Sequence, residues 1–213
     1  HEKRKWLRFV TVIESLFFLP YNEIIINMFE AHRAGRSDLS MDYKGKKCLI
    51  AYFSHAGMNY VSGKIVNLKV GNTEQAAKMI SRMTGGDLFH IRAAAVYPHE
   101  YKETVSLARH EWEKRLRPAL ARDLDDISGY DLVFLGYPNW CGTMPMAMWT
   151  FLENHDFSGK TIYPFCTHEG SGIGRSLEDI HALCPKATLG TSLVILGSTV
   201  QDAESDVRRW LNG

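Results

Sequence analysis

Residues 132–142 read Leu-Val-Phe-Leu-Gly-Tyr-Pro-Asn-Trp-Cys-Gly. The first four form a continuous apolar run, which is typical of a strand that is buried on both faces of a parallel sheet. The glycines, the proline and the asparagine that follow predict a turn. Because ligands of parallel sheets bind outside the carboxyl ends of the strands, we expect the flat rings of Tyr137 and Trp140 to face a flat ligand there.

Strand and helix patterns alternate along the chain from Lys46 onward. Apolar runs predict strands over 48–53, 88–91, 132–136, 161–166 and 189–196, and periodic apolar faces predict helices over 73–83, 101–116, 144–152, 174–183 and 203–211. Pro145 falls in the first turn of the third helix, where proline is tolerated. Five strand–helix units favour a doubly wound α/β/α sandwich around a parallel sheet over an eightfold barrel, which needs more units.

The first 45 residues are predicted to be a helical extension that precedes this domain, which spans residues 46–213. Apolar residues recur at helical spacing from Trp6 to Phe17, Pro20 ends that pattern, and a second short apolar face follows at 24–29. Three alternatives stay open for residues 1–40. They cover one face of the domain, they form a homodimer contact, or they are upstream sequence that is not native to the working protein, since Met41 could be a start.

Composition narrows the class of protein. Apolar residues make up 45% and charged residues 23%, and 25 basic residues balance 24 acidic ones. This balance predicts no binding to nucleic acid or to an acidic surface. The apolar run over 9–19 loosely resembles a signal peptide, but Glu14 interrupts it, and it is too short for a membrane span of about 20 residues. The four cysteines lack C-x-x-C spacing and are interpreted as buried free thiols in a reducing compartment, the cytoplasm.

Small polar residues and glycines follow the first predicted strand. Ser54, His55 and Ala56 end it, and Asn72 and Thr73 open the next helix. Backbone amides and the positive end of a helix attract phosphate, and hydroxyl groups donate to its oxygens. Asn72 or Thr73 could equally be a plain helix cap. The chain has no G-x-G-x-x-G and no G-K-[ST] motif in this region, which disfavours a dinucleotide fold or a P-loop.

Two further loops follow strands at the same predicted edge, residues 138–143 and 167–172. Each alone is read most simply as a turn, but three such loops at one edge indicate a ligand site. His168 and Glu169 suggest a proton donor. The alternative, which we favour, is that His168 only binds the ligand edge or the loop backbone, so no catalytic residue is assigned. The scattered histidines predict no metal site.

These loops resemble those of the flavodoxin family. Residues 136–145, Gly-Tyr-Pro-Asn-Trp-Cys-Gly-Thr-Met-Pro, are similar to a G-Y-P-x-W-x-G-T-x-P loop, and residues 165–172, Phe-Cys-Thr-His-Glu-Gly-Ser-Gly, to an F-C-T-H-x-G-S-G loop. Residues 51–54, 71–74 and 85–89 are similar to the first strand, the phosphate loop and the entry to the second strand. The resemblance implies the flavodoxin-like five-stranded sheet, in the order 2-1-3-4-5.

The resemblance also implies a bound FMN. The residues implied to hold it are Ser54, His55, Ala56, Asn72 and Thr73 at the phosphate, Pro138, Asn139, Trp140, Cys141 and Gly142 against the ring, and Thr167, His168, Glu169, Gly170 and Gly172 along its other edge. The implied function is electron transfer between a reductase and an acceptor. The alternative is an NAD(P)H-dependent FMN oxidoreductase that acts on quinones or similar acceptors. The expected partner of this chain is accordingly a redox protein, for the carrier, or a small electron acceptor, for the enzyme.

The chain departs from the family pattern at two places. Residues 58–71 are an insertion in the phosphate loop, and their sequence predicts a small hairpin around residues 62–64. This hairpin either folds over the cofactor phosphate or decorates the surface. Cys141 stands where many relatives carry a second large residue, which weakens the case for two aromatic walls around the ring.

Overall fold

The computed structural model describes residues 41 and 43–213. The helices predicted within residues 1–40, and the dimer contact considered for them, lie outside the described residues. Residues 41–212 form one compact unit. No helix in the described part of the chain has the length and apolarity needed to cross a membrane.

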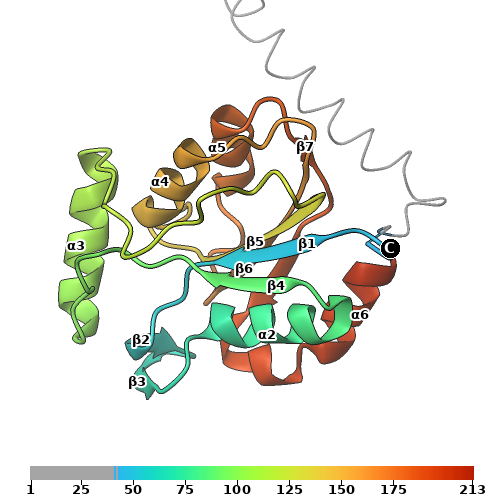
Figure 1. Ribbon diagram of the computed structural model, residues 1–213. Coiled ribbons are helices and arrows are strands. Elements are labelled where there is room, and N and C mark those ends of the chain that lie inside the picture. The colour runs from blue at the N-terminus through green and yellow to red at the C-terminus, as the bar shows by residue number, and fades with distance from the viewer. Residues whose placement is uncertain (1–40, 42) are drawn as a thin grey trace, which may run out of the picture. The chain divides into compact units, whose positions relative to one another are not determined.

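The core of the unit is a parallel sheet (Figure 1). Its strands lie side by side in the order β4 (Asp87–His90), β1 (Cys48–Tyr52), β5 (Leu132–Pro138), β6 (Thr161–His168) and β7 (Thr188–Leu189). Strand β8 (Leu193–Leu196) also pairs with β6. Apart from the hairpin strands, this is the predicted order 2-1-3-4-5, with the fifth strand in two pieces. The chain leaves β1 and β5 toward opposite faces of the sheet, so a crevice forms between their carboxyl ends.

Helices cover both faces of the sheet and complete the predicted α/β/α sandwich (Figure 1). One face carries α2 (Asn72–Thr84), the 3₁₀ helix η1 (Gly197–Asp202) and α6 (Glu204–Asn212), and the other carries α4 (Met146–Asn154) and α5 (Ser176–Leu183), while α3 (Tyr101–Glu113) contacts α4 and β2. Each face has its own apolar core. Ile80 and Trp210 belong to the first, and Phe151 and Ile180 to the second.

The fifth strand is broken, whereas the sequence predicts one strand over 189–196. Between the two pieces, three residues (190–192) lie opposite two residues of β6, Tyr163 and Pro164. Pro164 has no N–H to donate to the ladder, and an extra residue in one strand makes a bulge. Gly190 fits there because a Cβ on it would lie 2.2 Å from the Tyr163 ring.

Two helix boundaries also differ from the prediction. The helix expected over 144–152 begins at Met146, and Pro145 precedes it with an extended ψ of 146°. The residue before a proline disfavours the helical region, so Met144 stays outside the helix. The helix expected over 101–116 ends at Glu113 because Arg115 adopts a left-handed φ of 50°.

The predicted hairpin in the insertion is confirmed. Strands β2 (Gly57–Val61) and β3 (Lys64–Leu68) pair antiparallel, separate from the main sheet. Their two-residue turn places Ser62 at φ 46° and Gly63 at φ 83°, as a type I′ turn requires. The hairpin therefore has a fixed register and a defined tip.

Candidate functional site

The first loop packs against the start of α2, where Gly71 and Thr73 are buried. Gly71 is the cap residue, and a Cβ there would lie 2.3 Å from Ser54 Oγ and 2.5 Å from the His55 carbonyl oxygen. Ser54 Oγ accepts a hydrogen bond from the Glu74 amide at 3.0 Å. The cap is therefore neither Asn72 nor Thr73. Among the described residues, the amides of Asn72 and Thr73 meet no acceptor, as expected of the first turn of a helix, and this is an anion-binding arrangement.

The second loop is a tight turn. The Trp140 and Thr143 backbones exchange hydrogen bonds of 2.9 and 3.0 Å, while Cys141 and Gly142 have φ of 55° and 79°. These are the angles of a type I′ turn. Asn139 secures it, because its Oδ1 accepts from the Gly142 amide at 3.1 Å.

Asn139 also joins the second loop to the third. Its amide donates to the Thr167 carbonyl at 2.9 Å, and its Nδ2 donates to the Gly172 carbonyl at 2.7 Å. Both loops are thus held in one arrangement by a single residue. Sequence similarity assigned Asn139 to the ligand, whereas its hydrogen bonds are with the two loops.

The Trp140 indole is held by aromatic edges. Its ring centroid lies 5.2 Å from Phe53, 5.8 Å from His55 and 5.2 Å from Tyr97, at interplanar angles of 71–78°. Such edge-to-face contacts favour one ring orientation. Trp140 is therefore a pre-oriented flat surface at the carboxyl end of β5.

Tyr137 does not share this role, and the expectation that its ring faces a ligand is wrong. Its side chain is fully buried in the apolar core, and its hydroxyl lies 2.8 Å from Ser176 Oγ. Side chains alternate along a strand, so Tyr137 turns to the opposite side from its neighbours.

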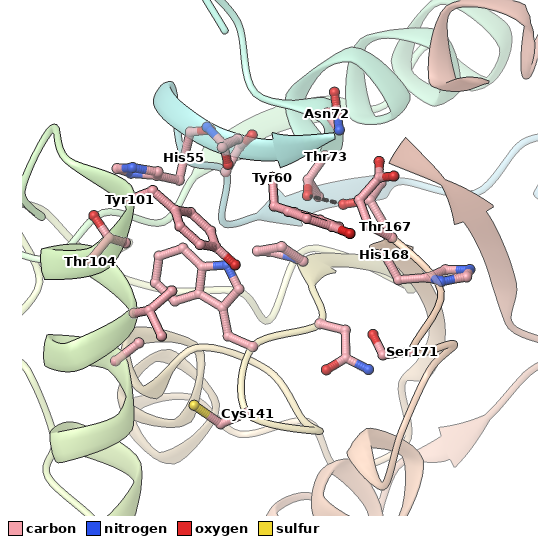
Figure 2. A pocket seen from close by; sticks show the side chains of 18 of the residues that line it. His55, Tyr60, Asn72, Thr73, Tyr101, Thr104, Cys141, Thr167, His168 and Ser171 are labelled. Carbon is pink, nitrogen blue, oxygen red and sulfur yellow. Dashed lines mark hydrogen bonds between the residues drawn. The ribbon is translucent and has the colours of Figure 1, made fainter. Parts of the chain in front are cut away.

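The third loop folds around His168. His168 Nδ1 accepts hydrogen bonds from the amides of Gly170 at 2.9 Å and Gly172 at 3.0 Å. A nitrogen that accepts two amides carries no proton to give, so the ring acts as an internal cap of the loop. In Figure 2 the His168 ring points away from Tyr60. This agrees with the interpretation that His168 organises the backbone.

The three loops meet around one cavity of about 340 Å³ (Figure 2). The predicted residues that line it are Ser54, His55, Asn72, Thr73, Pro138, Asn139, Trp140, Cys141, Thr167, His168 and Glu169. The predicted residues that do not line it are Ala56, Gly142, Gly170 and Gly172. The three glycines have positive φ and shape the loops instead. The volume falls in the range of small-molecule sites, about 300–1,000 Å³.

The residues implied by the family resemblance leave out one wall of the cavity. It comes from the hairpin and from α3, and its residues are Met58, Asn59, Tyr60, Tyr101, Thr104, Val105, Ala108 and Arg109. Residues 101, 105 and 108 recur at helical spacing, a signal that the sequence contains but that reads equally as core packing. The hairpin thus lines the cavity and does not merely decorate the surface.

Two buried polar atoms in the cavity lining have no hydrogen-bond partner, His55 Nε2 and Glu169 Oε1. An unpaired buried polar atom is costly, so both are suited to a ligand that supplies partners. Burial lowers the pKa of His55, and nearby His99 lowers it further. His55 is therefore a neutral imidazole near pH 7.

The thiols divide into two groups. Cys48, Cys166 and Cys184 are buried, as predicted, whereas Cys141 is exposed in the turn. Burial nevertheless raises the pKa of the Cys141 thiol, and the Arg109 guanidinium offsets part of that rise. Within the described residues no group of His, Cys, Asp and Glu is placed to hold a metal ion.

Comparison with known proteins decides the family. The sequence model of a family described as Flavodoxin matches residues 47–213. This chain belongs to the flavodoxin family. The resemblance seen in the sequence is thereby confirmed at the level of the family, and it supports FMN as the cofactor of this flavodoxin.

Solved structures agree with this fold. A protein of Bacteroides eggerthii that was assigned as a flavoprotein is 30% identical with a TM-score of 0.64, covering 78% of this flavodoxin and 96% of that chain. A second, from Bacteroides uniformis, is 26% identical with a TM-score of 0.58, covering 77% and 99%. A Lactobacillus acidophilus flavoprotein solved in complex with FMN shares the fold at 19% identity and a TM-score of 0.54, covering 78% and 99%. No curated protein matches this sequence.

Proposed function

We propose that this flavodoxin binds FMN in the cavity and transfers electrons between a reductase and an acceptor. The observation that carries the proposal is the convergence of three loops on one cavity, with free amides at the start of α2 and the oriented Trp140 indole in the same lining. The free amides suit a phosphate, and the indole suits a flat ring. FMN contains both groups and supplies the redox chemistry when bound.

The residues present fit such a ligand. The amides of Asn72 and Thr73 bind the phosphate, the loop with Trp140 lies against the ring, and the loop from Thr167 to Gly172 lies along another edge. The unpaired His55 Nε2 and Glu169 Oε1 offer further polar contacts, as a neutral ring nitrogen and a carboxylate oxygen. The near-neutral charge of the chain gives no long-range attraction to a basic partner, so docking depends on short-range contacts.

A second candidate is an FMN-dependent NAD(P)H oxidoreductase that acts on quinones or similar acceptors. The wall of hairpin and α3 residues favours it, because Met58, Tyr60, Tyr101 and Val105 add apolar and aromatic surface beyond the residues implied for FMN. A small flat acceptor needs such a surface. An electron carrier that works only with protein partners does not.

Two measurements test these proposals in order. Apoprotein is titrated with FMN, and saturable quenching of flavin fluorescence at one equivalent supports the cofactor. The loaded protein is then given NADPH and a quinone without any reductase. Steady turnover supports the enzyme, and negligible turnover together with reduction by a separate reductase supports the carrier. If FMN does not bind, both proposals are wrong.

We also propose a cytoplasmic location. Three buried free thiols are stable in a reducing compartment. A redox protein or a small electron acceptor is the expected partner there.

A further inference from the structure

The carboxylate of Glu169 lies at the start of α2. Two residues before it, Thr167 Oγ1 lies 2.7 Å from Thr73 Oγ1, a buried hydrogen bond that joins the third loop to the helix (Figure 2). A Cβ on Gly197 would lie 2.7 Å from Glu169 Oε1 and 2.3 Å from Asn72 Nδ2. The carboxylate and the amide side chain of the first residue of α2 therefore converge on the same point.

This carboxylate is only half satisfied. Glu169 Oε2 accepts a hydrogen bond from the Ser62 amide, at the tip of the β2–β3 hairpin, at 3.1 Å. Oε1 is buried and has no partner among the described residues. No lysine or arginine of the described residues forms an ion pair with Glu169. Its negative charge is thus not neutralised by a salt bridge.

The same end of the cavity is where a flavin phosphate would be held. The amides of Asn72 and Thr73 meet no acceptor among the described residues, and the positive end of a helix attracts an anion. A phosphate there carries between one and two negative charges near neutral pH, and like charges a few ångströms apart repel. A ribityl hydroxyl, in contrast, is neutral and can donate to a free carboxylate oxygen.

We propose that Glu169 is a specificity-determining residue that weakens the discrimination of this site for FMN over riboflavin. Its charge opposes the phosphate but not the uncharged part of the flavin. The two flavins differ only in that phosphate, so the ratio of their affinities isolates the effect of the charge. The inference rests on the proposed binding of flavin in this cavity.

The test compares both flavins on apoprotein of the full chain. Dissociation constants for FMN and riboflavin are measured by fluorescence quenching for wild type, Glu169→Gln and Glu169→Ala. We expect the preference for FMN over riboflavin to rise about tenfold in both variants, the effect of removing one elementary charge from a partly solvated site. Any hydrogen bond from a ribityl hydroxyl to the carboxylate is removed for both flavins alike, so its effect cancels in the ratio.

Two variants serve as controls. Glu178→Gln removes the same charge from an exposed position on α5 that does not line the cavity, and it should leave the ratio unchanged. Glu169→Asp keeps the charge but shortens the side chain that reaches Ser62, and its ratio should stay within about threefold of wild type. Thermal melts establish that each variant is folded.

The outcomes separate this inference from the proposed function. If both flavins bind but the ratio is unchanged or falls in Glu169→Gln and Glu169→Ala, Glu169 does not oppose the phosphate and the inference is wrong. An equal rise in Glu178→Gln means that only net charge matters, which overturns it as well. If neither flavin binds to wild type, the proposed function itself fails.

Discussion

Replacing Trp140 by alanine tests whether this side chain is the platform for the flavin ring. The indole lines the cavity and is oriented by the rings of Phe53, His55 and Tyr97. Stacking of a flat base on an aromatic side chain contributes about 1–3 kcal/mol. We therefore expect the dissociation constant for FMN to rise about 5- to 150-fold in Trp140→Ala.

The substitution also removes packing, and this effect has to be measured separately. Trp140 is partly buried against the apolar core, so its loss should lower the free energy of unfolding by about 2 kcal/mol, less than for a fully buried Trp. Trp140→Phe keeps a flat ring and should fall between wild type and alanine in both measurements. Urea unfolding of the apoprotein gives the stability, and FMN titration of the folded apoprotein gives the affinity.

A second tryptophan provides the matched control. Trp112 lies on α3, is 38% exposed and does not line the cavity. Trp112→Ala should change the FMN dissociation constant by less than about twofold, as expected for a surface residue away from the site. An unchanged dissociation constant in folded Trp140→Ala refutes the platform, and so does an equal loss of affinity in Trp112→Ala.

Three other outcomes follow from the packing. Burial raises the pKa of Glu111 above 4.5, while the bond from the Tyr97 hydroxyl, at 2.7 Å, lowers it in part. The Glu111 carboxyl therefore stays protonated to a higher pH in the native state than in the unfolded chain. The stability that this proton contributes is lost as the pH rises through the raised native pKa. Glu111→Gln should therefore be more stable than wild type in urea unfolding at pH 7 and about equally stable near pH 4, and a difference in stability that does not grow with pH contradicts this account. Gly136→Ala should strongly lower the midpoint temperature of thermal unfolding, because the added Cβ would lie 2.1 Å from the Phe165 ring. An unchanged midpoint would mean that the sheet accommodates the methyl group without cost and would contradict this prediction. In native protein a thiol reagent should modify Cys141 first, and mass mapping that finds a buried cysteine first would contradict the exposed turn.

Local pattern was enough to predict most strands and helices. The apolar run at the start of β5 and the helical spacing in α2 reflect burial directly, so both elements were predicted within a few residues. The fifth strand was not, because its break depends on Pro164 in the neighbouring strand. Pairing with a residue far along the chain leaves no mark in the local sequence.

The three loops of the site were predicted for a related reason. Loops that follow parallel strands emerge at one edge, so the alternation of strands and helices is enough to bring residues 54, 139 and 168 together. The roles of individual side chains were harder to predict. His168 caps its own loop, and Tyr137 points into the core. Both arrangements depend on the backbone angles and on the surrounding residues rather than on residue type.

By itself the sequence determined that the chain has a parallel sheet, that it belongs to the flavodoxin family, and which loops border the cavity. Apolar periodicity and short motifs are local properties of a chain, so they can be recognised without the structure. Only the tertiary structure decided that the hairpin and α3 form another wall, and that Glu169 meets Asn72 at the start of α2. These contacts join residues distant in the chain, and their geometry depends on how whole elements pack.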